Sequence, residues 1–128
     1  TLDNKKNTFI AGSSMGGLIS LFAVIKYPKV FGGAGVFSPA FWTAPALENY
    51  LAKNGMKLRS KLFFYAGGKE GESMIPDMKK IEAMIKNLPR YRTDNSSSKI
   101  YEIIDDDAKH NEAAWRKYFP LFYKWMLN

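Results

Sequence analysis

The residues of this sequence best suited to chemistry are one serine, one histidine and several carboxylates. Ser14 lies in the segment GSSMG, residues 12–16, which has the pattern G-x-S-x-G. Where a strand turns sharply into a helix, this pattern exposes the serine hydroxyl, because the glycines carry no side chains that would block it. His110 is the single histidine of the chain, and imidazole is the usual base for a serine nucleophile. The two residues predict nucleophilic catalysis by Ser14, with His110 as its base.

Both residues also have a purely structural interpretation. The pair Gly16-Gly17 would serve a turn that lets a helix pack closely on a strand equally well, and His110 could be an exposed loop residue. The order along the chain favours catalysis, because α/β-hydrolases place the serine first, then the acid, then the histidine. The backbone N–H of Met15, directly after the nucleophile, is then the expected oxyanion donor, aided by the helix N-terminus.

The acid of such a site is expected after the third strand, in GGKEGESMIPD, residues 67–77. Glu70 is nearest the strand end and has glycines on both sides, which permit an inward turn. Glu72 is the second choice, and Asp77 is assigned to the first turn of a helix, where a carboxylate is common. The alternative for Glu70 is a solvated loop carboxylate.

Composition and charge argue against several other classes of site. The chain has no cysteine, which excludes a thiolate nucleophile, a disulfide and a cysteine metal site. Asp105, Asp106 and Asp107 lie near His110, but one nitrogen ligand beside neighbouring loop carboxylates predicts no metal site.

The net charge of +7 is dispersed, which indicates solvated faces and not nucleic-acid binding. No apolar run is long enough for a membrane helix, and no leader peptide is visible. The sequence does not decide the cellular compartment of the protein.

The elements that must position these residues alternate regularly along the chain. Strands are predicted at 8–11, 34–37, 61–66 and 99–104, helices at 15–27, 45–53, 76–88 and 112–127, and a polar loop at 93–98. This alternation predicts one α/β domain with a parallel sheet and helices on both faces. Sites in such sheets form at the carboxyl ends of the strands. Ser14, Ser38, Glu70 and His110 each follow one strand, so we expect them to meet there.

Three stretches together carry a resemblance to a known family. They are FIAGSSMGGLISLFAVIKYPKVFGGAGVFSPAFW, FFYAGGKEGE and HNEAAWRKYFP. They resemble the C-terminal half of the esterase family of α/β-hydrolases that includes esterase D, feruloyl esterases, ferric-siderophore esterases and mycolyltransferases. The resemblance implies Ser14 as nucleophile, His110 as base and Glu70 as acid, although some siderophore esterases are thought to use a Ser–His dyad. It also places a substrate-binding region at Ser13, Ser38, Phe41 and Trp42.

The expected function is hydrolysis of a small carboxylic ester or thioester through an acyl-enzyme, without a cofactor. An acyltransferase on the same fold and a non-catalytic module that binds carbohydrate or a partner are the alternatives. The resemblance implies a complete sheet of about eight strands, of which this chain supplies four. Residues 1–128 are therefore expected to be the C-terminal part of one domain whose N-terminal half is absent. A bare sheet edge at 8–11 would then favour self-association.

Overall fold

A sheet of four parallel strands forms the centre of the computed structural model, which describes residues 5–89, 91 and 99–128. Within these residues the strands lie in the order of the chain: β1 (Phe9–Ser13), β2 (Gly33–Phe37), β3 (Lys61–Gly67) and β4 (Ile100–Asp105). All three neighbouring pairs are parallel. The predicted α/β class is confirmed, and the predicted loop at 93–98 lies outside the described residues.

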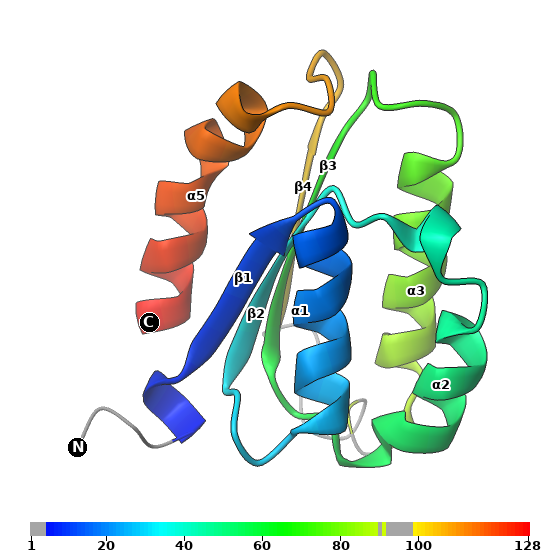
Figure 1. Ribbon diagram of the computed structural model, residues 1–128. Coiled ribbons are helices and arrows are strands. Elements are labelled where there is room, and N and C mark those ends of the chain that lie inside the picture. The colour runs from blue at the N-terminus through cyan, green and yellow to red at the C-terminus, as the bar shows by residue number, and fades with distance from the viewer. Residues whose placement is uncertain (1–4, 90, 92–98) are drawn as a thin grey trace.

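Helices cover both faces of the sheet, as the alternation predicts. Figure 1 shows α1 (Met15–Lys26), α2 (Leu47–Asn54) and α3 (Met74–Lys86) on one face, and α5 (Glu112–Leu127) on the other. Short 3-10 turns occur at Lys5–Asn7, Phe41–Thr43 and Gly55–Lys57. No helix within the described ranges is long and apolar enough to cross a membrane.

The core is divided by the sheet into two apolar layers. Along β3 successive side chains alternate between them, so Leu62 and Phe64 pack under α1 and α3, whereas Phe63 and Tyr65 pack under α5. Every residue of β2 is buried. A parallel strand covered on both faces reads as a continuous apolar run, which is the pattern of these two strands.

The predicted ends of the elements differ from the observed ends by up to two residues, except for α5, whose bounds are those predicted. The helix predicted from Pro76 begins at Met74 instead. Pro76 lies in its first turn, where the missing N–H would have no partner within the helix. Pro120 lies inside α5, which continues through it to Leu127.

The strands end level with one another, which matters for the site. Ser13 pairs with Phe37, Phe37 pairs with Tyr65, and Tyr65 pairs with Ile103. The residues that follow these strands therefore emerge at the same edge of the sheet. This register is what allows residues far apart in sequence to meet.

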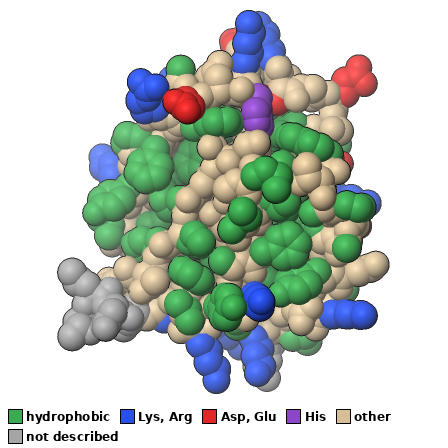
Figure 2. All heavy atoms as spheres, in the orientation of Figure 1, with side chains coloured by type: hydrophobic (Ala, Val, Ile, Leu, Met, Phe, Trp, Pro, Cys, Tyr) green, Lys and Arg blue, Asp and Glu red, His purple; other side chains and the backbone are tan. Residues whose placement is uncertain are grey.

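The outer edge of β1 has no neighbouring strand within the described residues. On the face shown in Figure 2, hydrophobic side chains gather over β1, α1 and α5. Two of these elements carry large hydrophobic side chains that are about half exposed: Met15 and Ile19 in α1, and Phe119 and Tyr123 in α5. An unpaired strand with apolar surface on both sides is a typical surface for further association.

At the other edge, a buried carboxyl group belongs to Glu82 of α3. Burial, followed by the hydrogen bond and the negative charge of Glu102 on β4, raises the pKa of Glu82 to about 8. The same hydrogen bond lowers the pKa of Glu102, which also accepts a hydrogen bond from Lys79 Nζ at 3.2 Å. Glu82 therefore retains its proton at neutral pH and Glu102 is ionised.

We expect Glu82 to make the protein less stable as the pH rises from about 4.5 to 8. The unfolded chain loses this proton near the ordinary glutamate pKa of 4.5, whereas the folded chain keeps it until about pH 8. The contribution of Glu82 to stability is therefore full below about pH 4.5 and is lost as the pH rises through the folded pKa. Glu82→Gln keeps a donor toward Glu102 and removes the titration. By pH 8 the variant should gain on the order of a few kcal/mol relative to wild type. Urea unfolding across this pH range measures it.

Glu48→Gln is the matched control for this prediction. Glu48 is an exposed carboxylate paired with Lys80 at 3.1 Å, and exposed pairs contribute little to stability. The free energy of unfolding of Glu48→Gln should change with pH as that of wild type does. If that of Glu82→Gln also changes with pH as in wild type, the raised pKa of Glu82 would be contradicted.

Candidate active site

Ser14 occupies a sharp turn between β1 and α1. Its φ of 57° lies in the left-handed region, which is costly for a residue other than glycine. Three backbone hydrogen bonds hold the turn: Ser14 N–H donates to Phe37 O at 2.9 Å, and Leu18 and Ala40 N–H donate to Ser14 O at 3.2 and 3.1 Å. This is the geometry in which a strand-to-helix turn exposes a serine hydroxyl.

Two glycines, Gly12 and Gly17, allow the backbone segments around this turn to approach one another closely. A Cβ on Gly12 would lie 2.6 Å from the backbone of Gly16, and one on Gly17 would lie 2.7 Å from Phe37 O. A Cβ on Gly16 would meet nothing within 4 Å among the described residues. Close packing of the helix on the sheet therefore depends on Gly17 and not on Gly16.

We expect Gly17→Ala to lower the free energy of unfolding by about 1–3 kcal/mol, because its Cβ would collide with backbone that cannot rotate away. Gly16→Ala lies one residue earlier in the same helix. It should leave stability unchanged or raise it by up to about 1 kcal/mol, since alanine favours helix. Thermal unfolding of both variants in the full-length protein makes the comparison. Equal melting temperatures would be inconsistent with the close approach of α1 to β2.

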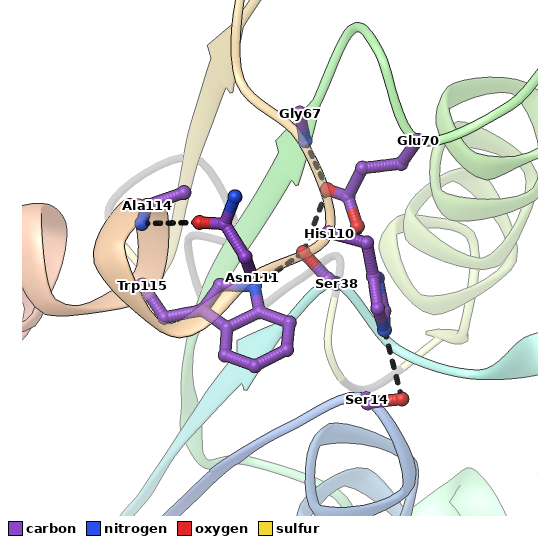
Figure 3. A network of polar contacts seen from close by, with 8 residues as sticks. All are labelled: Ser14, Ser38, Gly67, Glu70, His110, Asn111, Ala114 and Trp115. Atoms are coloured by element: carbon purple, nitrogen blue, oxygen red, sulfur yellow. Dashed lines mark hydrogen bonds and ion pairs between the residues drawn. The ribbon is translucent and has the colours of Figure 1, made fainter.

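A line of polar contacts joins the serine, the histidine and the acid that the sequence selected. His110 Nε2 lies 3.0 Å from Ser14 Oγ. His110 Nδ1 is in contact with Glu70 Oε1 (Figure 3). The predicted contact between Glu70 and His110 is thus present, while Glu72 is exposed and Asp77 lies in the first turn of α3.

The Glu70 carboxylate is buried and fully held. Its side chain has no exposed surface. Oε2 accepts hydrogen bonds from Gly67 N–H at 2.5 Å and from the Ser38 hydroxyl at 2.7 Å. A buried charge requires such partners, and here they leave Oε1 to the histidine.

His110 lies on the loop between β4 and α5, with about a third of its side chain exposed. Asn111 caps α5 by accepting a hydrogen bond from Ala114 N–H at 3.0 Å, so the helix begins directly after the histidine. The imidazole has two aromatic neighbours: Trp115 perpendicular to it with ring centroids 5.0 Å apart, and Trp42 at 6.0 Å. These contacts restrict the ring without burying it.

Two groups beside these residues have shifted pKa values. The hydrogen bond from Tyr118, followed by that from Asp107 N–H, lowers the pKa of Asp105. Burial, followed by the negative charges of Glu70 and Asp105, raises the pKa of Tyr65. Asp105 therefore binds α5 as a carboxylate and Tyr65 stays neutral. In the part of the chain that is described, no three His, Asp or Glu side chains cluster as a metal site.

The residues expected to contact substrate separate into two kinds. Ser38 is completely buried, and Phe41 packs in the core under α1 and α3. Ser38 presents no surface and Phe41 very little, so contact of either residue with substrate stays a prediction. Trp42 is 58% exposed and faces His110, so it stays a candidate.

Ser13 lines an apolar groove of about 350 Å³ beside the turn. The other residues of this groove come from β1, β2 and α5: Ala11, Gly12, Phe37, Trp115, Arg116, Phe119 and Pro120. A larger hollow of about 630 Å³ lies at the other end of α1, around Tyr27 and Tyr50, and contains none of the residues just described. The groove is therefore the better candidate for holding a substrate.

Trp115 is the residue that the sequence analysis missed. Its indole N–H donates to Ser38 Oγ at 2.8 Å and its ring contacts His110. The sequence does place Trp115 in the first turn of the helix that follows the histidine. That position indicates a role at the site only once it is known that this turn packs against the end of β2.

Known proteins share this arrangement of strands and helices. The chain matches the family described as "Esterase: Putative esterase" over residues 1–125. It is similar to the enterobactin esterase FES from Shigella flexneri, with a TM-score of 0.74, 21% identity and coverage of 97% of this chain and 31% of that chain. It is also similar to the S-formylglutathione hydrolase FrmB from Staphylococcus aureus, with a TM-score of 0.73, 20% identity and coverage of 98% and 53%.

A curated relative matches over a shorter region. Sixty residues are 38% identical to the uncharacterized protein YbbA of Bacillus subtilis (strain 168), covering 47% of this chain and 24% of that protein. Of the two solved structures, the chain spans about half the length of FrmB and about a third of the length of FES. Since the family match runs over nearly the whole chain, and both solved structures share its fold, this chain belongs to the esterase family and has an α/β-hydrolase fold.

Proposed function

We propose that this chain carries the catalytic residues of a serine esterase. The observation that carries the proposal is the continuous contact from Ser14 Oγ through the His110 imidazole to the buried Glu70 carboxylate. A hydroxyl, an imidazole and a carboxylate in this order are the arrangement that activates a serine. Membership of the esterase family supports the same chemistry.

The proposed reaction follows from the contacts. His110 Nε2 takes the proton of Ser14 Oγ as the oxygen attacks the carbonyl carbon of a carboxylic ester or thioester. Glu70 holds Nδ1–H, so that Nε2 is free to accept, and stabilises the imidazolium that forms. The imidazolium then protonates the leaving alcohol or thiol. Water, deprotonated by His110, attacks the acyl-enzyme and regenerates Ser14.

Met15 is the proposed source of one oxyanion donor. It is the first residue of α1, so its N–H has no acceptor within the helix and lies at the positive end of the helix dipole. The apolar groove beside Ser13 has the chemistry to receive an acyl or aryl group. These features support a small-molecule ester as the substrate.

A fluorophosphonate probe tests the proposal directly, since it reacts with activated serines. We expect the full-length protein to be labelled at Ser14, and at no other serine, at neutral pH. Product analysis with an added alcohol then separates hydrolysis from acyl transfer. A protein that resists the probe and hydrolyses no short-chain aryl ester would refute the proposal and favour a binding module.

We also propose that further strands of the same protein cover the free edge of β1. Its support is the unpaired strand and the half-exposed hydrophobic side chains of α1 and α5, which are Met15, Ile19, Phe119 and Tyr123. The relatives are also about two to four times as long as the matched region. We expect the 128-residue chain alone to self-associate at micromolar concentration. Light scattering measures this, and a stable monomer would count against the proposal.

A further inference from the structure

We infer that Ser38 and Trp115 act as a pair that positions the acid of the proposed triad, an inference that rests on the proposed function. Ser38 directly follows β2, is completely buried, and has a φ of 45°. With Ser14, it is one of two described residues other than glycine with positive φ. Strained backbone of this kind tends to lie at functional sites. It turns the Ser38 hydroxyl toward Glu70 at the end of the neighbouring strand (Figure 3).

The donors and acceptors in this contact leave one arrangement of hydrogens. The indole N–H of Trp115 can only donate, so Ser38 Oγ accepts from it at 2.8 Å. An ionised carboxylate can only accept, so the Ser38 hydroxyl hydrogen points at Glu70 Oε2, 2.7 Å away. Trp115 thereby orients the Ser38 hydroxyl as a donor. A hydrogen-bond chain of this kind polarises each member and strengthens the last bond.

The consequence is a carboxylate that cannot rotate. Ser38 and Gly67 N–H both bind Oε2, which leaves Oε1 facing His110 Nδ1. Without Ser38, only the Gly67 N–H would hold Oε2, and the plane of the carboxylate could turn. A displacement of about 1 Å in such a relay can cost about 100-fold in rate.

Trp115 acts at both ends of the acid–base pair. Its N–H reaches the acid through Ser38, and its ring lies perpendicular to the His110 ring with centroids 5.0 Å apart. The hydrogen bonds of Ser38 and Trp115 lead to Glu70 and not to Ser14, so both act as positioning residues for the acid. Trp115 in addition lines the apolar groove. The first turn of α5 therefore sets the geometry of a reaction that takes place at the end of β1.

The test is a double-mutant cycle in the full-length protein with a short-chain aryl ester. We expect Ser38→Ala to lower kcat by about 10- to 100-fold, with KM changed less than about twofold. Trp115→Phe keeps a ring against His110 and loses only the N–H donor, so a loss of about 3- to 10-fold is expected. Because Trp115 acts through Ser38, Trp115→Phe should add little in the Ser38→Ala background.

Two variants control for packing. Ser60 is also completely buried and donates to a backbone carbonyl, Phe31 O at 2.7 Å, so Ser60→Ala matches Ser38→Ala without touching the acid. Trp125→Phe makes the same ring change further along α5, where Trp125 contacts Phe63 and Tyr101. Both should keep kcat within about twofold of wild type, because neither residue lies in the relay.

The outcomes separate this inference from the proposed function. Three results would each overturn the inference that Ser38 and Trp115 position Glu70: an unchanged kcat in Ser38→Ala, fully additive losses in the double variant, or an equal loss in Ser60→Ala. Each of these results can occur while Ser14→Ala still abolishes activity. A Ser14→Ala protein that stays active would instead overturn the esterase site itself. Thermal unfolding of each variant confirms that the enzymes compared are folded.

Discussion

Ser14→Ala should lower kcat/KM for short-chain aryl esters by about 10⁴-fold or more in the full-length protein. The variant lacks the only oxygen that His110 Nε2 contacts in the described residues, at 3.0 Å. No covalent intermediate can form, and the remaining rate would come from the oxyanion donors and binding alone. Ester hydrolysis measured with substrate well below and above KM gives the two constants separately.

Ser13→Ala is the matched control. Ser13 is the neighbouring residue, lies in β1 and lines the apolar groove. Its loss should affect KM more than kcat, because a group that lines the groove contributes to binding in the ground state as well as the transition state. Activity of Ser14→Ala within tenfold of wild type would show that Ser14 is not the nucleophile.

Glu70→Gln is expected to lower kcat by about 10²- to 10⁴-fold. The reason lies in the donors around it. Gly67 N–H and the Ser38 hydroxyl both point at Oε2, so the amide oxygen of the variant must take that place. Its NH₂ group then faces His110 Nδ1, which must accept a hydrogen bond. That tautomer carries its proton on Nε2 and cannot take one from Ser14.

The control for this variant is Glu72→Gln, which changes an exposed carboxylate two residues away and should leave kcat unchanged. The same pair of variants decides between a triad and a Ser–His dyad. If Glu70→Gln keeps kcat within about threefold of wild type, the dyad is correct and the buried acid is structural. The Ser14→Ala result does not depend on that outcome.

The sequence alone was sufficient to predict the helices and strands and the place where the candidate site residues meet. Alternation of strands and helices predicted the parallel sheet, because buried strands and amphipathic helices differ in their apolar period. It also predicted the edge at which Ser14, Glu70 and His110 meet, since parallel strands bring all their carboxyl ends to one side. The choice of Glu70 over Glu72 and Asp77 rested on distance from the strand end, and Glu70 is the carboxylate that contacts His110 in the structure.

The tertiary structure decided what each remaining side chain does. Ser38 and Phe41 follow a strand end just as Ser14 does, yet both point into the protein. Their orientation depends on a positive φ at Ser38 and on the packing of helices distant in sequence, which no local pattern encodes. The same holds for Trp115, whose partner lies 77 residues earlier in the chain. Residue types and order are local properties, whereas a hydrogen bond between two strand ends exists only once the register and the covering helix are in place.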